Sequence, residues 1–240
     1  MPLPKIATPY YELTLPSTNK TIKFRPFLVK EEKLLVLALE TEDTKQITNA
    51  IKQVLKSCIQ TRGVKVENLP TFDIEYLFLN IRAKSVGEVV EVTITAPDDG
   101  VTPIDLEIDL EDIQVQKSEN HTKQVRLDDN LMMDMKYPSL DQFIKNNFDF
   151  EGSTTSLEQS FELIASCIDK IYNKDEVWAS EDCTKKELVE FLEQMNSTQF
   201  KQIEKFFDTM PKLSHTLEVV NPKTKVKSPV VLEGLQSFFA

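Results

Sequence analysis

The feature of this sequence with the clearest chemical potential is a run of carboxylates between residues 87 and 116. That stretch holds nine Asp and Glu residues and no Lys or Arg. Asp105, Glu107, Asp109 and Glu111 occupy alternate positions, so a strand would point all four to one face, spaced about 7 Å apart. Such a row can dock a basic partner or attract a divalent cation. It is equally typical of a solvated strand face, because charges protect exposed strands from aggregation.

Two more specific chemistries fit these acids poorly. A calcium-binding loop needs polar residues or glycine at positions that Leu106, Ile108 and Leu110 fill here. A hydrolase with paired carboxylates needs two acids facing each other across a cleft with separated pKa values. One row on one strand supplies neither arrangement, so a hydrolase is the least favoured interpretation.

A second charged feature, of opposite sign, lies near the C-terminus. Lys223, Lys225 and Lys227 cluster there, and we expect them on a hairpin that either contacts an acidic partner or is simply solvated. That partner could be the acidic strand of another copy. A nucleic-acid site usually adds aromatic side chains among its basic residues, but no Phe, Tyr or Trp occurs between Lys212 and Lys227. A net charge of −11 also argues against nucleic acid as the main partner.

The last residues are unusually apolar for a chain end. Leu235, Phe238 and Phe239 are three large apolar side chains among the final six residues. Because chain ends usually fray, an apolar end needs a reason. We expect these side chains either to fold back onto their own core or to insert into a groove of a partner.

The usual ingredients of catalysis and cofactor binding are scarce. The five glycines are isolated, so no phosphate-cradling loop is present, and no GxSxG motif occurs. The three cysteines form no CxxC pair, and the two histidines, His121 and His215, are expected at the surface. Trp178 is expected in the core. The sequence therefore predicts no enzyme, no metal site, no cofactor and no small-molecule substrate.

No segment suggests a membrane. No window approaches 18 uncharged apolar residues, and the first residues lack the apolar core of a secretory signal. We therefore expect no membrane partner.

The first half of the chain begins with a hairpin over 11–24 and two helices within 29–61. A third helix begins at Thr71, and its apolar residues leave few polar positions, so we expect it at the centre of a core. From residue 87 the apolar period changes to two, which predicts strands over 90–95 and 104–110 joined by a turn at 97–100. Shorter strands are expected near 113–116, 124–127 and 132–136.

Helical patterns return after residue 138. Capping boxes beginning at Ser139, Thr155 and Thr184 mark three helix starts. The helix after Thr155 is expected to carry Ile168 and Ile171 on its apolar face. Further short helices precede a final hairpin over 216–232.

These patterns together predict an α+β fold in which antiparallel hairpins and a small sheet combine with helical segments. With 240 residues, the chain suits one large domain or two small ones. The turn-rich stretch after residue 148 suggests an N-terminal α+β region over 1–148 and a C-terminal helical region over 149–240 that ends in a hairpin. A single domain is the alternative.

Four segments, in order along almost the whole chain, carry a family resemblance: KFRPFLVKEEK at 23–33, DIEYLFLNIRAKSVG at 73–87, MKYPS at 135–139 and LEGLQSFF at 232–239. They resemble the baseplate hub subunit, or hub assembly protein, family of T-even-like contractile-tailed bacteriophages. The resemblance implies a structural or chaperone-like protein without enzymatic activity. Its implied partners are other hub and tail proteins, or a second copy. It implies assembly in the host cytoplasm and a place in or near the tail baseplate.

The chain departs from this family at one point. Some relatives carry cysteine knuckles at the tips of hairpins like the two expected here, where this chain has residues 96–100 and 221–224 instead. The thiolate and imidazole ligands of a zinc site are therefore missing.

An alternative function needs no phage context. A generic host-side binding module could dock a basic protein through the acidic strand alone. Charge reversal at Asp105, Glu107 and Asp109 would then abolish binding.

Overall fold

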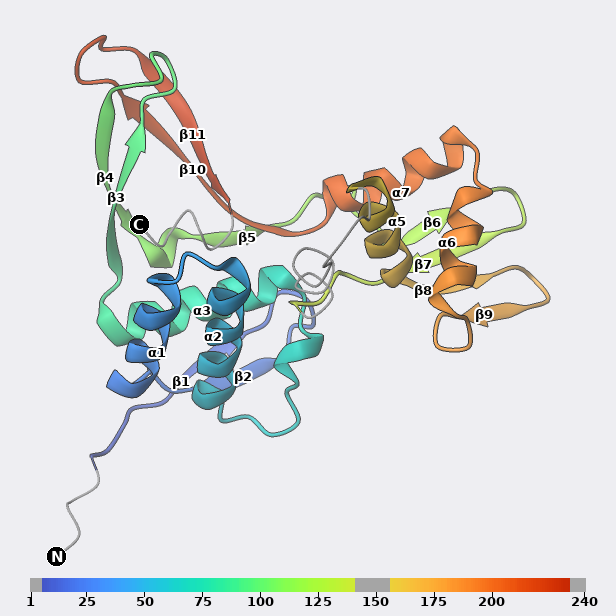
Figure 1. Cartoon of the computed structure of the whole chain (residues 1–240), viewed down its shortest axis with the longest axis horizontal. Coiled ribbons are helices and arrows are strands. Elements are labelled where there is room, and N and C mark those ends of the chain that lie inside the picture. The colour runs from blue at the N-terminus through green and yellow to red at the C-terminus, as the bar shows by residue number, and fades with distance from the viewer. Residues whose placement is uncertain (1–5, 141–155, 234–240) are drawn as a thin grey trace, which may run out of the picture. The chain divides into compact units, whose positions relative to one another are not determined.

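The computed structural model describes residues 6–140 and 156–233, which form two compact units (Figure 1). Unit 1 contains the described residues of 1–66, 72–116 and 212–240, and unit 2 those of 67–71 and 117–211. Both units combine helices with small antiparallel sheets, which confirms the α+β class. Each unit is assembled from segments that are distant in sequence. The division expected between residues 148 and 149 lies outside the described residues and stays a prediction.

Unit 1 opens with the expected hairpin and helices. Strands β1 (Tyr11–Thr14) and β2 (Thr21–Phe24) pair antiparallel and are followed by α1 (Val29–Leu39) and α2 (Thr44–Cys58). Asp43 caps α2 by accepting hydrogen bonds from the N–H groups of Lys45 and Gln46. A short 3-10 helix, η1 (Val66–Asn68), precedes α3 (Thr71–Val86).

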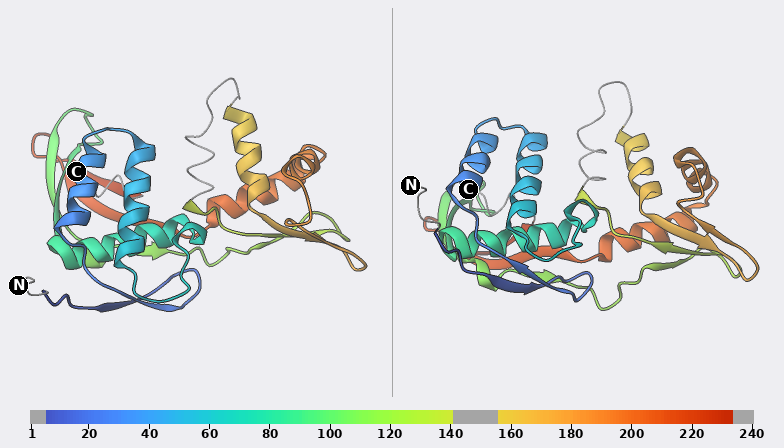
Figure 2. Two further views of the ribbon diagram at one scale, coloured as in Figure 1. Left: turned by 60° about the horizontal axis from the view of Figure 1, so that its bottom comes forward. Right: turned by 90° about the horizontal axis from the view of Figure 1, so that it is seen from below.

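Helix α3 is buried around most of its circumference, as its sequence predicted. Figure 2 shows α1 and α2 on one side of α3 and the β1–β2 hairpin along the other. Its one fully buried carboxylate, Asp73, accepts hydrogen bonds from the backbone N–H and the hydroxyl of Ser17 in the β1–β2 turn. Phe27 N–H donates to the Ser85 hydroxyl at 2.9 Å. The residues of α3 that are buried are Phe72, Asp73, Ile74, Leu77, Phe78, Leu79, Ile81 and Ala83.

Two hairpins complete unit 1. Strands β3 (Val89–Thr95) and β4 (Pro103–Asp109) form one of them, and a 3-10 helix, η2 (Leu110–Asp112), follows β4. Strands β10 (Lys212–Val220) and β11 (Lys227–Glu233) form the other, and β5 (Gln114–Gln116) pairs with the opposite edge of β10. The inner faces of the two hairpins pack together through Ile104, Val219 and their neighbours. Nearer α3, both pack against Leu79 and Ala83.

Unit 2 is a four-stranded antiparallel sheet in the order β6–β7–β8–β9, packed against helices. The strands are β6 (Gln124–Arg126), β7 (Met132–Met135), β8 (Ile168–Tyr172) and β9 (Val177–Ala179). The helices are α5 (Ser156–Ser166), α6 (Lys185–Glu193) and α7 (Ser197–Thr209). Strand residues Val125, Met133 and Ile171 share a core with helix residues Leu192 and Phe206.

The helix expected from Thr155 to Ile171 is too long. Helix α5 ends at Ser166, and Ile168 and Ile171 lie in strand β8, between β7 and β9. Both side chains are buried in the core of unit 2, so the apolar spacing was read correctly but assigned to the wrong element. The Thr184 capping box is confirmed, with Glu187 N–H donating to the Thr184 hydroxyl. The boxes at Ser139 and Thr155 depend on residues outside the described ranges.

His121, expected at the surface, is instead half-buried in unit 2. Its two ring nitrogens lie 3.0 Å from the hydroxyls of Thr209 and Tyr137, and its ring lies against Phe206 and Tyr137. Burial, with a smaller effect of nearby Lys123, lowers the pKa of His121. The side chain therefore fastens the loop before β6 to helix α7.

A buried ion pair fastens the start of α1 to the end of β2. The Arg25 guanidinium lies 2.9 Å from the Glu31 carboxylate, and Glu31 is only 5% exposed. The same carboxylate accepts the N–H of Leu28 at 2.8 Å. Burial alone would raise the pKa of Glu31, but the hydrogen bonds from Arg25 and Leu28 together bring that pKa below its ordinary value. The pair therefore stabilises the fold above the pKa of an unfolded Glu and loses its effect as pH falls through the folded pKa.

Glu31→Ala is expected to destabilise unit 1 by about 3 kcal/mol, because it leaves the largely buried Arg25 charge, 12% exposed, without its carboxylate partner. Chemical denaturation followed by circular dichroism measures this. The matched control is Glu32→Ala, one residue along on the exposed side of α1, which is expected to change stability by less than about 0.5 kcal/mol. Equal effects of the two variants would contradict the role given to the ion pair.

Candidate interaction surface

The acidic row predicted from the sequence exists on strand β4. Asp105, Glu107 and Asp109 are exposed, whereas Ile104 and Ile108, which point to the opposite face of the strand, are buried against the rest of unit 1. The carboxylates therefore stand on the outer face of the β3–β4 hairpin.

The neighbouring strand does not neutralise this row. In the register of the hairpin, Glu107 faces Glu91, and Asp105 faces Thr93, whose hydroxyl donates to the Asp105 carboxylate at 2.7 Å. Like charges directly opposite each other in a sheet are destabilising. The outer face thus keeps an unbalanced negative charge at some cost to the hairpin.

Glu111 does not belong to the row, contrary to expectation. It lies in η2, where the chain leaves the strand, and its carboxylate lies 2.8 Å from the Lys84 ammonium group. Lys84 also lies 2.6 Å from Glu88. Hydrogen bonding to Glu111 and then to Glu88 raises the pKa of Lys84, and the same contact lowers the pKa of Glu111. Lys84 precedes residues 87–116, so the charge balance of that stretch does not include it.

The tips of the two hairpins are joined by a cluster of hydrogen bonds, here called the tip clasp. The amide nitrogen of Asn221 donates to Asp98 and to Asp99, both at 2.9 Å, and the Thr224 hydroxyl donates to Asp98 at 2.5 Å. Figure 1 shows the β3–β4 and β10–β11 tips side by side. Asn221 is 1% exposed, so the clasp is centred on a buried amide.

Each tip is also braced within itself. Asp99 accepts the hydroxyl of Thr102 at 2.6 Å, and Gly100 has φ +67, which favours glycine. The amide oxygen of Asn221 accepts a hydrogen bond from the N–H of Lys223 at 2.8 Å. The Asn221 side chain therefore stabilises its own turn and also binds the turn of the β3–β4 hairpin. The hydroxyls of Thr224 and Thr102, with help from Asn221, lower the pKa values of Asp98 and Asp99 respectively.

The predicted lysines flank this clasp. Lys223, Lys225 and Lys227 are all exposed on the β10–β11 tip and the strand that leaves it. The acidic row and the lysines, separated by more than 100 residues in sequence, therefore lie on two hairpins that pack against each other. We call the outer faces of these hairpins the two-hairpin surface. Leu235, Phe238 and Phe239 lie outside the described residues, and their role stays a prediction.

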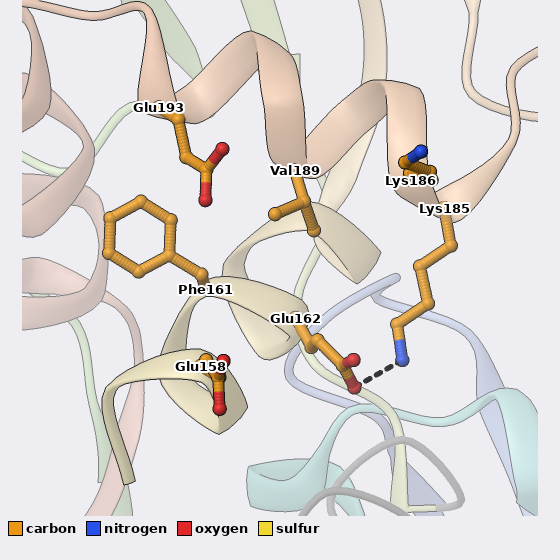
Figure 3. Close-up of a pocket in the computed structure, with 7 residues that line it drawn as sticks. All are labelled: Glu158, Phe161, Glu162, Lys185, Lys186, Val189 and Glu193. Carbon is orange, nitrogen blue, oxygen red and sulfur yellow. Dashed lines mark hydrogen bonds and ion pairs between the residues drawn. The ribbon is translucent and has the colours of Figure 1, made fainter. Parts of the chain in front are cut away.

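Unit 2 has a groove between α5 and α6, shown in Figure 3, with a volume of about 570 Å³. Phe161 and Val189 form its apolar part, and the Lys185 ammonium lies 2.5 Å from the Glu162 carboxylate at its rim. The other lining side chains are Glu158, Lys186 and Glu193. None of these lining residues is a serine, threonine, cysteine or histidine.

Within residues 6–140 and 156–233, no group of three or more His, Cys, Asp and Glu side chains is placed to hold a metal ion. The same ranges contain no helix that is both long and apolar enough to cross a membrane.

Comparison with known proteins identifies the family. The family model described as T4 bacteriophage base plate protein matches residues 8–240. The chain belongs to this base plate protein family. None of the curated proteins and none of the solved structures matches it. Membership confirms the phage baseplate part of the resemblance, while a place in the hub stays a prediction.

Sequence reasoning found the charged residues of this base plate protein but missed the ones that position them. The sequence places Asn221 and Thr224 in one turn, and it places Asp98 and Asp99 both in another turn and in the acidic run. The Asn-Pro and Asp-Asp-Gly turns were visible signals. The pairing of one turn with the other was not visible, because it depends on how the hairpins pack.

Asn221→Ala is expected to lower the melting temperature at pH 7, because it leaves Asp98 and Asp99 without the donor between them. Since the folded pKa values of both acids are depressed, the clasp acts in full above the ordinary Asp pKa of about 4 and is lost progressively as pH falls from there through the lower folded pKa values. The difference between variant and wild type should therefore shrink between about pH 4 and pH 2. Thermal melts across this range measure it. Asn130→Ala, in an exposed turn, is the control, and a difference independent of pH would contradict the clasp.

Proposed function

We propose that this base plate protein is a non-enzymatic structural or assembly (chaperone-like) protein of the baseplate hub, and that it docks other hub and tail proteins through the two-hairpin surface. The observation that carries the proposal is the one-sign row of Asp105, Glu107 and Asp109, which no described lysine or arginine neutralises. Family membership supplies the baseplate context.

The support beneath this row suits docking. The inner face of β3–β4 packs against β10–β11, and the tip clasp holds the far ends together. A surface braced on its inner side and at its tip loses little conformational freedom on binding. Its charges are then presented in a fixed pattern.

The charges also define the partner. The acidic row fits a basic strip of lysines and arginines, and the lysine tip fits a carboxylate-rich neighbour. A second copy could meet both needs by placing its lysine tip on the acidic row. Self-association through these two patches is therefore part of the proposal.

The proposed site of action is the host cytoplasm during tail assembly, followed by either retention in the tail baseplate or release. Mass spectrometry of purified virions distinguishes these two fates. The non-enzymatic role is supported by membership of the base plate protein family.

Charge reversal tests the surface. Asp105→Lys with Glu107→Lys is expected to reduce retention of baseplate proteins by the tagged chain from infected cells at least tenfold. Wild-type retention should itself weaken between about 50 and 300 mM salt, because exposed charges are screened over a Debye length near 10 Å at 0.1 M.

The matched control is Glu204→Lys with Asp208→Lys, two exposed acids on α7 in unit 2 that give the same change in net charge. Equal loss of retention by both double variants would show a response to overall charge and would overturn the proposed surface. A tagged wild-type chain that retains no baseplate protein would overturn the function itself.

A further inference from the structure

Strand β9 of unit 2 is the free edge of the four-stranded sheet. The strand order β6–β7–β8–β9 leaves β9 with a neighbour on one side only, and Figure 1 shows it at the margin of that sheet. Its three residues are Val177, Trp178 and Ala179.

The hydrogen bonds on either side of β9 fix which backbone groups face outward. Asn173 N–H donates to Glu176 C=O, and Ser180 N–H donates to Asp169 C=O, both at 2.9 Å. Hydrogen-bonded pairs alternate along an antiparallel ladder, so Trp178 bonds to Ile171 while Val177 and Ala179 point their backbone groups away from β8. The Ala179 C=O is taken by Asp182 N–H at 3.0 Å. The Val177 N–H and C=O and the Ala179 N–H face the open side of the sheet.

The side chains of this edge are apolar and accessible. Trp178 continues the cross-strand row of Val125, Met133 and Ile171, which are buried, yet it is 40% exposed. The prediction that Trp178 lies in the core is therefore wrong, because much of its side chain is exposed. Val177 points to the opposite face and is 65% exposed. A partner strand would bury apolar surface on both faces.

This edge is short, with three residues, which is one of the devices that protect an edge strand, but it lacks most of the others. Natural sheets blunt their edges with lysine, proline, bulges or a covering element. Residues 177–179 contain no lysine, proline or bulge, and their outward backbone groups form a template for one more strand. Tryptophan is also one of the residues enriched among those that dominate binding energies at interfaces.

The charges beside β9 select the occupant. The exposed residues just before and after it are Lys174, Asp175, Glu176, Glu181 and Asp182, four carboxylates against one lysine. Antiparallel pairing of two copies centred on Trp178 would place Lys174 of one copy opposite Asp182 of the other, but it would also place Asp175 opposite Glu181 and bring together two flanks that each have more carboxylates than lysines. The flanking charge therefore disfavours a second copy and favours a strand flanked by lysine or arginine.

We infer that β9 accepts an extended segment of another protein as a fifth strand, with apolar side chains at alternate positions and basic residues at its ends. The outward backbone groups of Val177 and Ala179 would supply the ladder, and Trp178 the apolar anchor. This site lies in unit 2 and goes beyond the docking surface proposed for unit 1.

The chain itself carries the probe for the test. Trp178 is its one tryptophan, so its fluorescence reports directly on this edge. The full chain is titrated, up to millimolar concentration, with the soluble peptide acetyl-KKVTVTVKK-amide and separately with acetyl-EEVTVTVEE-amide. The basic peptide is expected to shift the emission of Trp178 to shorter wavelength, to reduce acrylamide quenching, and to slow hydrogen exchange at the Val177 and Ala179 amides. The acidic peptide is expected to bind at least tenfold more weakly.

Val177→Lys is expected to weaken binding of the basic peptide at least tenfold, because it adds both a protecting charge and a repulsion. Val231→Lys, on exposed strand β11 of unit 1 at 55% exposure, is the matched control and should change binding less than twofold. Circular dichroism confirms folding of both variants. No shift with the basic peptide, equal binding of both peptides, or self-association through β9 in sedimentation without peptide would each overturn the inference. The variant Asp105→Lys with Glu107→Lys is expected to bind the basic peptide as the wild type does. The titration therefore tests this inference independently of the proposed docking surface.

Discussion

The enclosure of helix α3 is the constraint on which unit 1 depends. A helix with apolar residues around most of its circumference can be stable in water only when other elements cover several of its sides. Helices α1 and α2, the β1–β2 hairpin and the strands around β10 provide that cover. Two buried carboxylates are paired, Asp73 with Ser17 and Glu31 with Arg25, as charged groups removed from water require. Segments from both ends of the chain are therefore drawn into one core.

The same constraint shapes the surface proposed to bind partners. The inner faces of β3–β4 and β10–β11 are used to cover the core and each other, which leaves their outer faces to water. Charged residues at alternate positions then fall on the outside because side chains alternate along a strand. The tip clasp adds a fixed contact at the point farthest from α3, where the apolar core is thinnest. Acidic row and lysine tip are thus held on one scaffold.

The sheet of unit 2 is covered on one face and left open at one edge. Helices cover one face, and the core residues of adjacent strands line up in rows that end at β9. The row of apolar side chains extends to Trp178 on the edge strand, where the helices no longer cover it fully, so Trp178 exposes apolar surface at the margin of the sheet. An uncovered apolar edge in a protein of a multiprotein tail structure is consistent with a contact that forms only on assembly.

The sequence alone determined the class of fold, most elements and the face on which the charges lie, because these depend on local periodicity, turn residues and the alternation of side chains. The acidic row at Asp105, Glu107 and Asp109 was predictable for that reason. Prediction from the sequence was wrong where short-range patterns are ambiguous. Ile168 and Ile171 fit the face of a helix as well as a buried strand, and Glu111 continues the alternation of acidic residues after the strand has ended. Only the tertiary structure decided that Lys84 neutralises Glu111, that Asn221 grips Asp98 and Asp99, and that β9 has no neighbour on its outer side. These are contacts between segments distant in the chain, and no local pattern encodes which of the many possible partners a core brings together.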